Sequence, residues 1–423
     1  MTLAATFLGG AKSRLLPPSL PFRFFVAAAV FHVALWAVLL AAGEEAASFR
    51  GGLGPALAAV HLLTLGVLTT TAIGAAVQLL PVATRRALAA EWPIRLVFWL
   101  TVPGLIVLIA GMYTYDPLVL IVGAVATTAG LLLFAGLLAE NLRRGGSLQV
   151  VAAYGWAAFA ALIGLVALGL ALSIDFERGF FADHAAVALA HMILGGFGFM
   201  GMLALGFSHV LVPMFALSSA PAKRPAYVAF AATVVAIVLG TMGAAHGSTV
   251  ILTIAGVIGV AAAAAHVWLM RIALRTGMRK RLGLSFVLVR ASWACLLLAP
   301  VVGLAALYGW AGANGATLFG LMLLGGWLMT FLFGILQRII PFLASMHVTQ
   351  AKGAPPLLSE LAAEGPLTVH AVCHGLALVG LTAAIILDNG MIVRGAAAIG
   401  LVGALAFAVF TGDVVRRLIA RRT

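Results

Sequence analysis

The sequence predicts an all-α, polytopic membrane protein with about twelve transmembrane helices. Hydrophobic residues make up 64% of the 423 residues, charged residues make up 9%, and the mean hydropathy is +1.17. Ordinary soluble domains carry roughly a quarter of charged residues, so this composition excludes a soluble globule. Because backbone polar groups in lipid need partners within the chain, the apolar runs of about 20 residues are expected to be helices.

Twelve apolar runs, separated by short polar breaks, define the expected spans. The first run, 22–42, is too long for the apolar core of a cleaved signal peptide, so we expect it to remain in the mature protein. Residues 1–423 are expected to form one membrane domain surrounded by the lipid bilayer. The expected spans are 22–42, 53–81, 94–113, 117–139, 150–173, 184–217, 226–244, 249–274, 284–309, 315–342, 366–386 and 391–417.

Positive charges are concentrated on one side of the expected bundle. If successive helices alternate in direction, the odd-numbered connections hold only Arg50, Arg178 and Arg394. The other 22 of the 25 Lys and Arg residues, including Arg85 and Arg86, fall on the opposite face. The positive-inside rule makes that face cytoplasmic, which predicts cytoplasmic termini and a bacterial inner-membrane location. The net charge of +13 therefore marks orientation and does not indicate nucleic-acid binding.

An internal repeat divides the chain into three units. A glycine stands seven residues before a proline in Gly74–Pro81, Gly206–Pro213 and Gly334–Pro341, and the prolines are 132 and 128 residues apart. Each proline can end its helix at the cytoplasmic side, because proline lacks the amide that would continue the hydrogen-bond ladder. The pattern predicts three pseudo-repeats of four helices each, covering about 22–144, 150–275 and 284–417.

Histidines occupy corresponding positions in the first two units. His61 and His191 each stand five residues before a glycine, and Leu321 takes that place in the third unit. Both histidines fall near the start of helices that run inward, at a similar depth in the outer third of the membrane. Two neutral imidazoles from different helices can hold a low-spin b-type haem. The alternative is a pair of core histidines hydrogen-bonded across helices.

The architecture and these motifs resemble the catalytic subunit of haem–copper oxidases and, within that group, the NnrS family of twelve-helix proteins. The likeness is carried by Pro21–Phe25, by the helix from His61 to Pro81 and by the helix from His191 to Pro213. The resemblance implies haem b as a cofactor, copper as a further metal, and a role in haem, copper or nitric-oxide metabolism. It also places His61 at the position of the oxidases' helix-2 ligand to the low-spin haem.

The sequence departs from the oxidases at the oxygen-reducing centre. Those enzymes have a tyrosine after the helix-6 histidine, a His-His pair in helix 7 and a His-x-His pair in helix 10. Here Phe197 and Phe199 follow His191, and the spans 226–244 and 315–342 contain no histidine. Proton pumping would need ionisable groups inside the membrane, yet Asp413 is the one carboxylate expected deep in a span. The sequence therefore does not predict a proton-pumping oxygen reductase.

Further polar residues are candidates for a site near the cytoplasmic face. His209, His266, His370 and His374 are expected to gather there as a metal-binding group, with Cys373 beside them as a soft ligand. The alternative is a set of histidines with polar tips in the headgroup region. His347 and His246 are expected in loops, His184 at a helix entrance, and His32 in the middle of the first helix.

The polar residues at the inner ends of the repeated helices are the last candidates. Gln78, Gln337 and Arg338 could contact haem propionates or lipid phosphates through charge-assisted hydrogen bonds. An ordinary anchoring role for Arg338 at the cytoplasmic face is the alternative.

Three functions compete on this evidence, of which one is a structural subunit whose histidines are incidental. The first is a haem-binding membrane protein engaged in electron transfer, with a respiratory electron-transfer partner, or in nitric-oxide, haem or copper handling. The second is a secondary transporter or metal permease without haem, because repeats and interrupted helices also mark transporters. The threefold repeat and the lack of buried charge for coupling favour the first.

Overall fold

The computed structural model describes residues 15–84, 90–144, 148–352 and 358–421. All regular secondary structure in these residues is helical. Twelve of the helices are long and apolar enough to cross a membrane. The predicted fold class is confirmed. The elements are α2 (Ser19–Ala41), α3 (Gly43–Ala47), α4 (Pro55–His61), η2 (Leu62–Thr69), α5 (Thr70–Thr84), α6 (Trp92–Thr114), α7 (Pro117–Arg144), α8 (Gln149–Arg178), α9 (His184–Ile193), η3 (Leu194–Gly201), α10 (Met202–Ala216), α11 (Lys223–Ala245), α12 (Thr249–Thr276), α13 (Gly283–Leu307), α14 (Gly315–Gly320), η4 (Leu321–Met329), α15 (Thr330–Lys352), α16 (Leu358–Leu361), α17 (Glu364–Leu387) and α18 (Gly390–Ala420).

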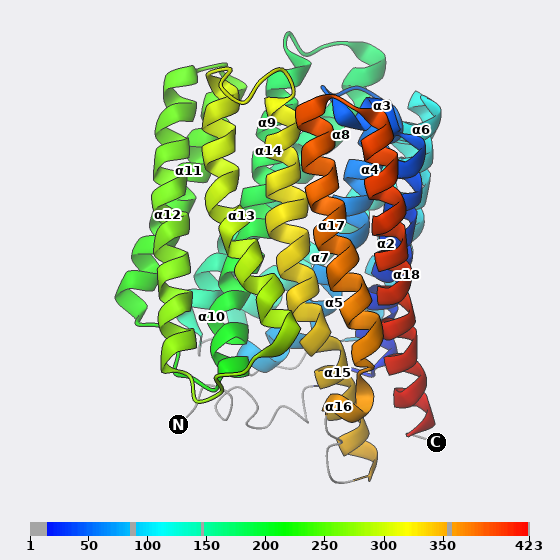
Figure 1. Ribbon diagram of the computed structural model, residues 1–423, viewed down its shortest axis with the longest axis vertical. Helices are drawn as coiled ribbons and strands as arrows, with labels where there is room; N and C mark the ends of the chain where they lie inside the picture. The colour runs from blue at the N-terminus through cyan, green and yellow to red at the C-terminus, as the bar shows by residue number, and fades with distance from the viewer. Residues whose placement is uncertain (1–14, 85–89, 145–147, 353–357, 422–423) are drawn as a thin grey trace.

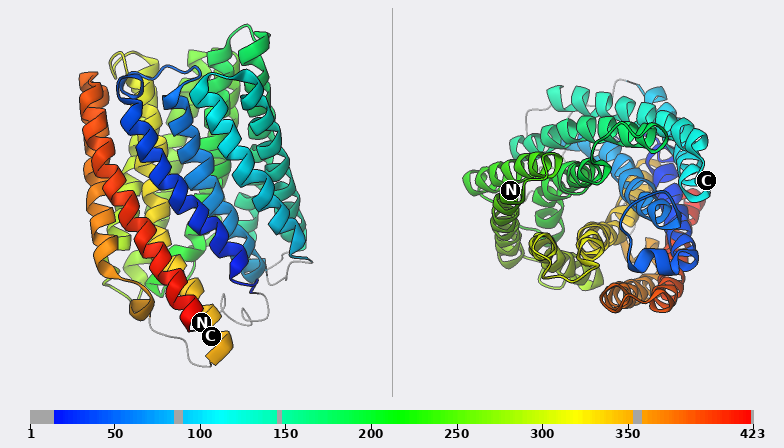
Figure 2. Two further views of the ribbon diagram at one scale, coloured as in Figure 1. Left: turned by 90° about the vertical axis from the view of Figure 1, so that its right-hand side faces the viewer. Right: turned by 90° about the horizontal axis from the view of Figure 1, so that it is seen from above.

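The long helices run side by side in Figure 1. The first residues of α2 and the last residues of α18 lie at the same end of the bundle. Viewed from above, the chain passes once around the bundle, and α18 returns to pack against α2 (Figure 2). Arg85 and Arg86, which contribute to the charge asymmetry, lie outside the described residues. Cytoplasmic termini therefore stay a prediction.

Three helices are interrupted at corresponding places by π-helical turns. The segments η2, η3 and η4 begin at Leu62, Leu194 and Leu321, close to the two histidines and the leucine of the sequence repeat. The three segments contact one another, so they meet in the interior of the bundle. In an 18-residue apolar stretch of each of these three helices, 67%, 50% and 67% of the residues are buried. The corresponding share in the other nine membrane-spanning helices of the described chain is 28–44%. Because π turns occur frequently at functional sites, the centre of the bundle is where we look for chemistry.

Threonine hydroxyls accompany two of these π turns. The hydroxyl of Thr70 donates to the carbonyl of Leu65 over 2.8 Å, and that of Thr330 donates to the carbonyl of Gly325 over 2.9 Å. Each bond spans five residues, the spacing of the π turn itself. In a membrane interior without water, such bonds help to satisfy backbone carbonyls where the α-helical ladder is broken.

The three repeated glycines allow close helix packing in equivalent places. A Cβ atom added to Gly74 would lie 2.8 Å from Cβ of Phe24 in α2, and one added to Gly206 would lie 2.7 Å from Cβ of Tyr154 in α8. A Cβ atom on Gly334 would lie 2.8 Å from the carbonyl oxygen of Ser285 in α13. Each glycine thus packs on the first helix of its predicted unit. These contacts support the three-unit division, which stays a prediction.

The repeated prolines lie near the ends of two helices and well inside the third. Pro81 and Pro213 each lie three residues before the end of their helices, and Pro341 lies eleven residues before the end of α15. Proline removes only one ladder hydrogen bond, and neighbouring groups in a membrane bundle can satisfy the freed carbonyl. His347, expected in a loop, therefore lies within the continued α15, buried, with its ring 6.4 Å from that of Phe22.

The hairpin of α6 and α7 depends on two glycines that let the helix backbones touch. A Cβ atom on Gly123 would clash with the backbone of Leu108, and one on Gly111 would clash with the backbone of Leu120. Backbone atoms cannot move aside as a flexible side chain can, so even an alanine must push the helices apart. Small residues that allow such approach are the usual means of helix association in membranes.

We predict that Gly123→Ala lowers the thermal midpoint of the detergent-purified protein, with a loss of about 1–3 kcal/mol from overpacking. Gly136→Ala is the matched control, because Gly136 lies on the same helix and an added Cβ meets nothing within 4 Å. The control should match the wild type or gain up to about 1 kcal/mol from helix propensity. Equal midpoints for both variants would contradict this packing.

Candidate functional site

His61 and His191 lie next to each other in the structure. Their ring centroids are 6.5 Å apart and the ring planes are inclined by 27°. His61 is the last residue of α4, directly before η2, and His191 lies three residues before the start of η3. Both side chains are only half-buried, although both helices belong to the bundle. The structure thus brings together the two histidines that the sequence repeat singled out.

The donor atoms of this pair suit a shared metal. Nδ1 of His61 lies 3.1 Å from the carbonyl oxygen of Leu57, so Nδ1 carries the proton and Nε2 keeps a free lone pair. Such a bond to a carbonyl is how proteins orient metal-binding histidines. Nδ1 of His191 is buried and has no hydrogen-bond partner within the described residues. Two imidazoles bound at ~2.0 Å on opposite sides of one metal have ring centres about 6 Å apart, close to the observed separation.

The surroundings of the pair are small or aromatic. A Cβ atom added to Gly169 of α8 would lie 2.9 Å from Cε1 of His191, so this glycine makes room for the imidazole ring. Farther along the central helices, Phe197 lies 6.2 Å from Phe319 and 5.8 Å from Trp327, measured between ring centroids. The residues present therefore fit an apolar, imidazole-ligated group such as haem.

Gln78 and Arg338 cannot contact a group held by this pair. Gln78 follows His61 by 17 residues, and a helix rises ~1.5 Å per residue, which separates them by roughly 25 Å. Arg338 follows Leu321, the residue equivalent to His61, by the same number of residues. The repeat therefore places both residues at the opposite end of the bundle from the pair, and their expected role as cofactor-binding residues stays a prediction.

Arg338 instead ties α15 to the start of α13. Its Nε donates to Oγ of Ser285 over 2.9 Å, and its guanidinium also donates to the carbonyl of Leu282. The guanidinium lies 5.9 Å from the ring centroids of both Phe215 and Phe286. These contacts match the anchoring alternative.

Gln78 and Gln337 are both buried. Neither amide atom of Gln78, nor the amide nitrogen of Gln337, has a hydrogen-bond partner in the part of the chain that the structure describes. Their function stays a prediction.

The four histidines expected to form one group occupy two separate places. His209 lies 5.5 Å from His266 between ring centroids, and this pair belongs to α10 and α12. His370 lies 5.7 Å from His374 on α17 and 5.7 Å from His32 on α2, the histidine whose partner the sequence did not identify. Sequence spacing could not separate these groups, because it carries no information on which distant helices pack together.

The second place is a chain of polar contacts across three helices. Nε1 of Trp36 donates to Nε2 of His32 over 2.9 Å, so the proton of neutral His32 is on Nδ1. Nε2 of His374 lies 2.8 Å from Oγ1 of Thr330, whose own hydrogen is donated to Gly325, so His374 must be the donor. His370 lies between them, and neither of its ring nitrogens has a hydrogen-bond partner among the described residues.

The remaining histidines lie at the ends of helices. His184 is the first residue of α9, as expected, and its Nδ1 lies 2.6 Å from Oδ2 of Asp175. His246 directly follows α11 in an exposed turn, as expected, with Nδ1 2.9 Å from the carbonyl oxygen of Met242. Both have local partners that account for them without a ligand.

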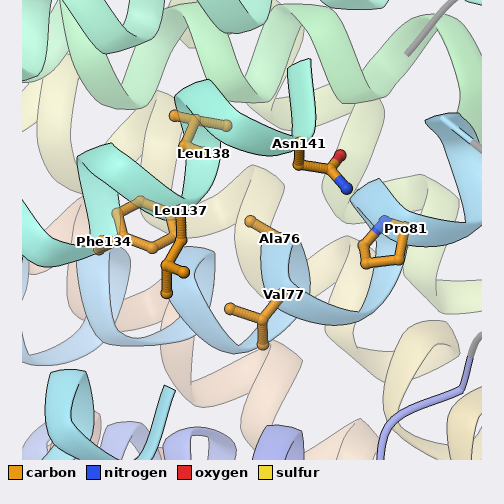
Figure 3. Close-up of a pocket in the computed structure, with 7 residues that line it drawn as sticks. All are labelled: Ala76, Val77, Pro81, Phe134, Leu137, Leu138 and Asn141. Atoms are coloured by element: carbon orange, nitrogen blue, oxygen red, sulfur yellow. The ribbon is translucent and has the colours of Figure 1, made fainter. Parts of the chain in front are cut away.

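A small pocket between α5 and α7 lies away from these histidines (Figure 3). Figure 3 shows it lined by apolar side chains and one amide. It carries no titratable group and offers no chemistry of its own. The lining residues are Ala76, Val77, Pro81, Phe134, Leu137, Leu138 and Asn141.

We predict that Thr330→Val destabilises the protein by about 1–3 kcal/mol, because Nε2–H of buried His374 loses its acceptor while side-chain shape is kept. Thr382→Val is the matched control, since that hydroxyl bonds only the carbonyl of Leu378 in its own helix. Thermal unfolding in detergent measures both. A midpoint for Thr330→Val as high as that of the control would contradict the assigned hydrogen bond.

No family model matches this sequence, and no curated protein is similar to it in sequence. The structure is similar to that of a haem–copper terminal oxidase, known from the cryo-EM structure of its dimer, with a TM-score of 0.61. The two chains are 12% identical, and the match covers 96% of this chain and 84% of the oxidase chain. At this identity the likeness establishes the fold alone, a bundle of membrane-spanning helices shared with that oxidase chain.

Proposed function

We propose that this chain is a haem-binding integral membrane protein that transfers electrons in a bacterial inner membrane. His61 and His191 would hold one b-type haem. The observation that carries this proposal is the meeting of the two imidazoles at 6.5 Å, with Nε2 of His61 left free by the bond from Nδ1 to Leu57. The fold it shares with a haem–copper oxidase supports the same assignment.

The neighbours of the two histidines orient their rings and make room for them. Leu57 orients the His61 ring through its carbonyl, and Gly169 leaves space for the His191 ring. A haem bound here would supply an iron atom that gains or loses one electron, and its potential would depend on the apolar surroundings. The surrounding helices would keep water from the ligand atoms.

The proposed chemistry is electron transfer and not oxygen reduction. Phe197 and Phe199 follow His191 where the oxidases have a tyrosine, and α11 provides no histidine pair. Nitric-oxide binding, or the handling of haem and copper for respiratory enzymes, is the narrower role that the resemblance to NnrS proteins suggests. A respiratory electron-transfer protein would be the partner.

We predict that the protein, purified in mild detergent from haem-replete cells, shows a b-type absorption spectrum with an intense Soret band. His61→Ala and His191→Ala should each abolish the low-spin spectrum, because a six-coordinate iron needs both imidazoles. Added imidazole should restore it in part by filling the space each substitution leaves. Absorption spectroscopy and haem extraction provide the measurements.

His246→Ala is the matched control, since His246 is exposed at the end of α11. It should leave the spectrum unchanged, and gel filtration should show that all variants remain folded. A colourless wild-type protein would overturn the haem proposal and favour the transporter without haem. A spectrum that survives both substitutions would show that other residues bind the haem.

A further inference from the structure

A second cluster of buried polar side chains lies between α8, α10 and α12. It consists of Tyr154, His209 and His266, whose side chains are 1%, 5% and 1% exposed. His209 follows His191 by 18 residues along the same membrane-spanning helix. A helix rises ~1.5 Å per residue, so the cluster lies roughly 27 Å from the His61–His191 pair. The cluster therefore cannot belong to the proposed haem site.

Each of the three side chains has one polar atom without a partner. These atoms are Oη of Tyr154, Nε2 of His209 and Nδ1 of His266, and none has a hydrogen-bond partner in the described chain. An unpaired polar group inside a protein costs about 1–3 kcal/mol. Three such groups side by side are expected to converge on something that satisfies them together.

The spacing of the rings suits a single bound metal. The His209 ring centroid lies 5.5 Å from that of His266, with the planes at 80°, and 5.6 Å from that of Tyr154. Two imidazoles bound at ~2.0 Å in neighbouring positions of one metal have ring centres about 4.5–5 Å apart, in tetragonal as in tetrahedral geometry. This arrangement differs from the 6.5 Å of His61 and His191, which suits ligands on opposite sides of a metal.

The fold builds this cluster through close packing. Gly206 lies one helical turn before His209, and a Cβ atom on it would be 2.7 Å from Cβ of Tyr154, so only glycine lets α10 approach the tyrosine. Phe230 of α11 packs against the tyrosine ring, with the centroids 5.0 Å apart. The three donors thus come from helices far apart in sequence and are held by apolar contacts.

We propose that Tyr154, His209 and His266 bind one first-row transition-metal ion, with copper(II) as the best-fitting ion. Imidazole nitrogen suits copper, and copper(II) has the highest affinity of the divalent series for such sites. The two imidazoles supply two donors, and the phenol of Tyr154, whose Oη has no partner among the described residues, supplies the third. Three protein ligands leave a further position for water or a small molecule.

Binding changes the charge of the site in a defined way. The phenol of Tyr154 loses its proton to the solvent and the phenolate oxygen bonds the metal, so one proton is released for each copper(II) bound. The phenolate cancels one of the two positive charges, which lowers the cost of placing the ion in an apolar interior.

The test is copper titration of the full-length protein after chelator treatment. We expect one copper to be retained through gel filtration, with nitrogen hyperfine structure in the electron paramagnetic resonance spectrum and a phenolate-to-copper absorption band. Tyr154→Phe should remove the absorption band and one released proton. His209→Gln and His266→Gln should each weaken binding by more than the ~10- to 100-fold that loss of an outer-shell partner costs.

The controls separate this site from the proposed haem site. His246→Gln and Tyr113→Phe should bind copper like the wild type, and so should His61→Ala with His191→Ala, whether or not the wild type binds haem. No retained copper would overturn the proposal and leave an ordered water as the group that joins the three side chains. A phenolate band that persists in Tyr154→Phe, or copper lost only with His61 and His191, would overturn it equally.

Discussion

The scarcity of water inside a membrane is the constraint on which this structure depends. Every buried donor and acceptor must find a partner within the chain, so helices form the entire bundle and threonine hydroxyls serve the π turns at Leu65 and Gly325. The same constraint makes unpaired groups informative. Imidazole nitrogens of His191, His209 and His266 lack partners within the described part of the chain, whereas those of His184 and His246 have them. Buried polar groups without protein partners are therefore the candidates for binding sites.

The number and order of the spans followed from the sequence because hydropathy is a local property. Over the described residues the structure has twelve apolar helices with bounds close to those expected. The sequence did not predict that α15 continues eleven residues beyond Pro341. Whether a proline ends a helix depends on partners from neighbouring helices. The position of His347 was wrong for the same reason.

The candidate site was predictable only where the repeat helped. His61 and His191 stand in equivalent positions of two repeat units. Because equivalent helices of the units meet near the centre of the bundle, the two histidines lie next to each other. The helix rise places Gln78 and Arg338 far from this pair, so the argument from the repeated histidines does not extend to them. Tyr154 escaped notice because it shares no motif with the histidines, and only packing against Gly206 places it beside His209.

The π turns have a consequence for the two ends of each central helix. A π turn takes in about one residue more than an α turn, and one residue corresponds to about 100° around the axis. The segments before and after η2, η3 and η4 therefore present their side chains in different directions. The face that carries His61 or His191 and the face that carries the glycine seven residues before proline are consequently set independently. A helix of this kind can hold a ligand at one level and a tight contact at another, so one level is free to change without disturbing the other.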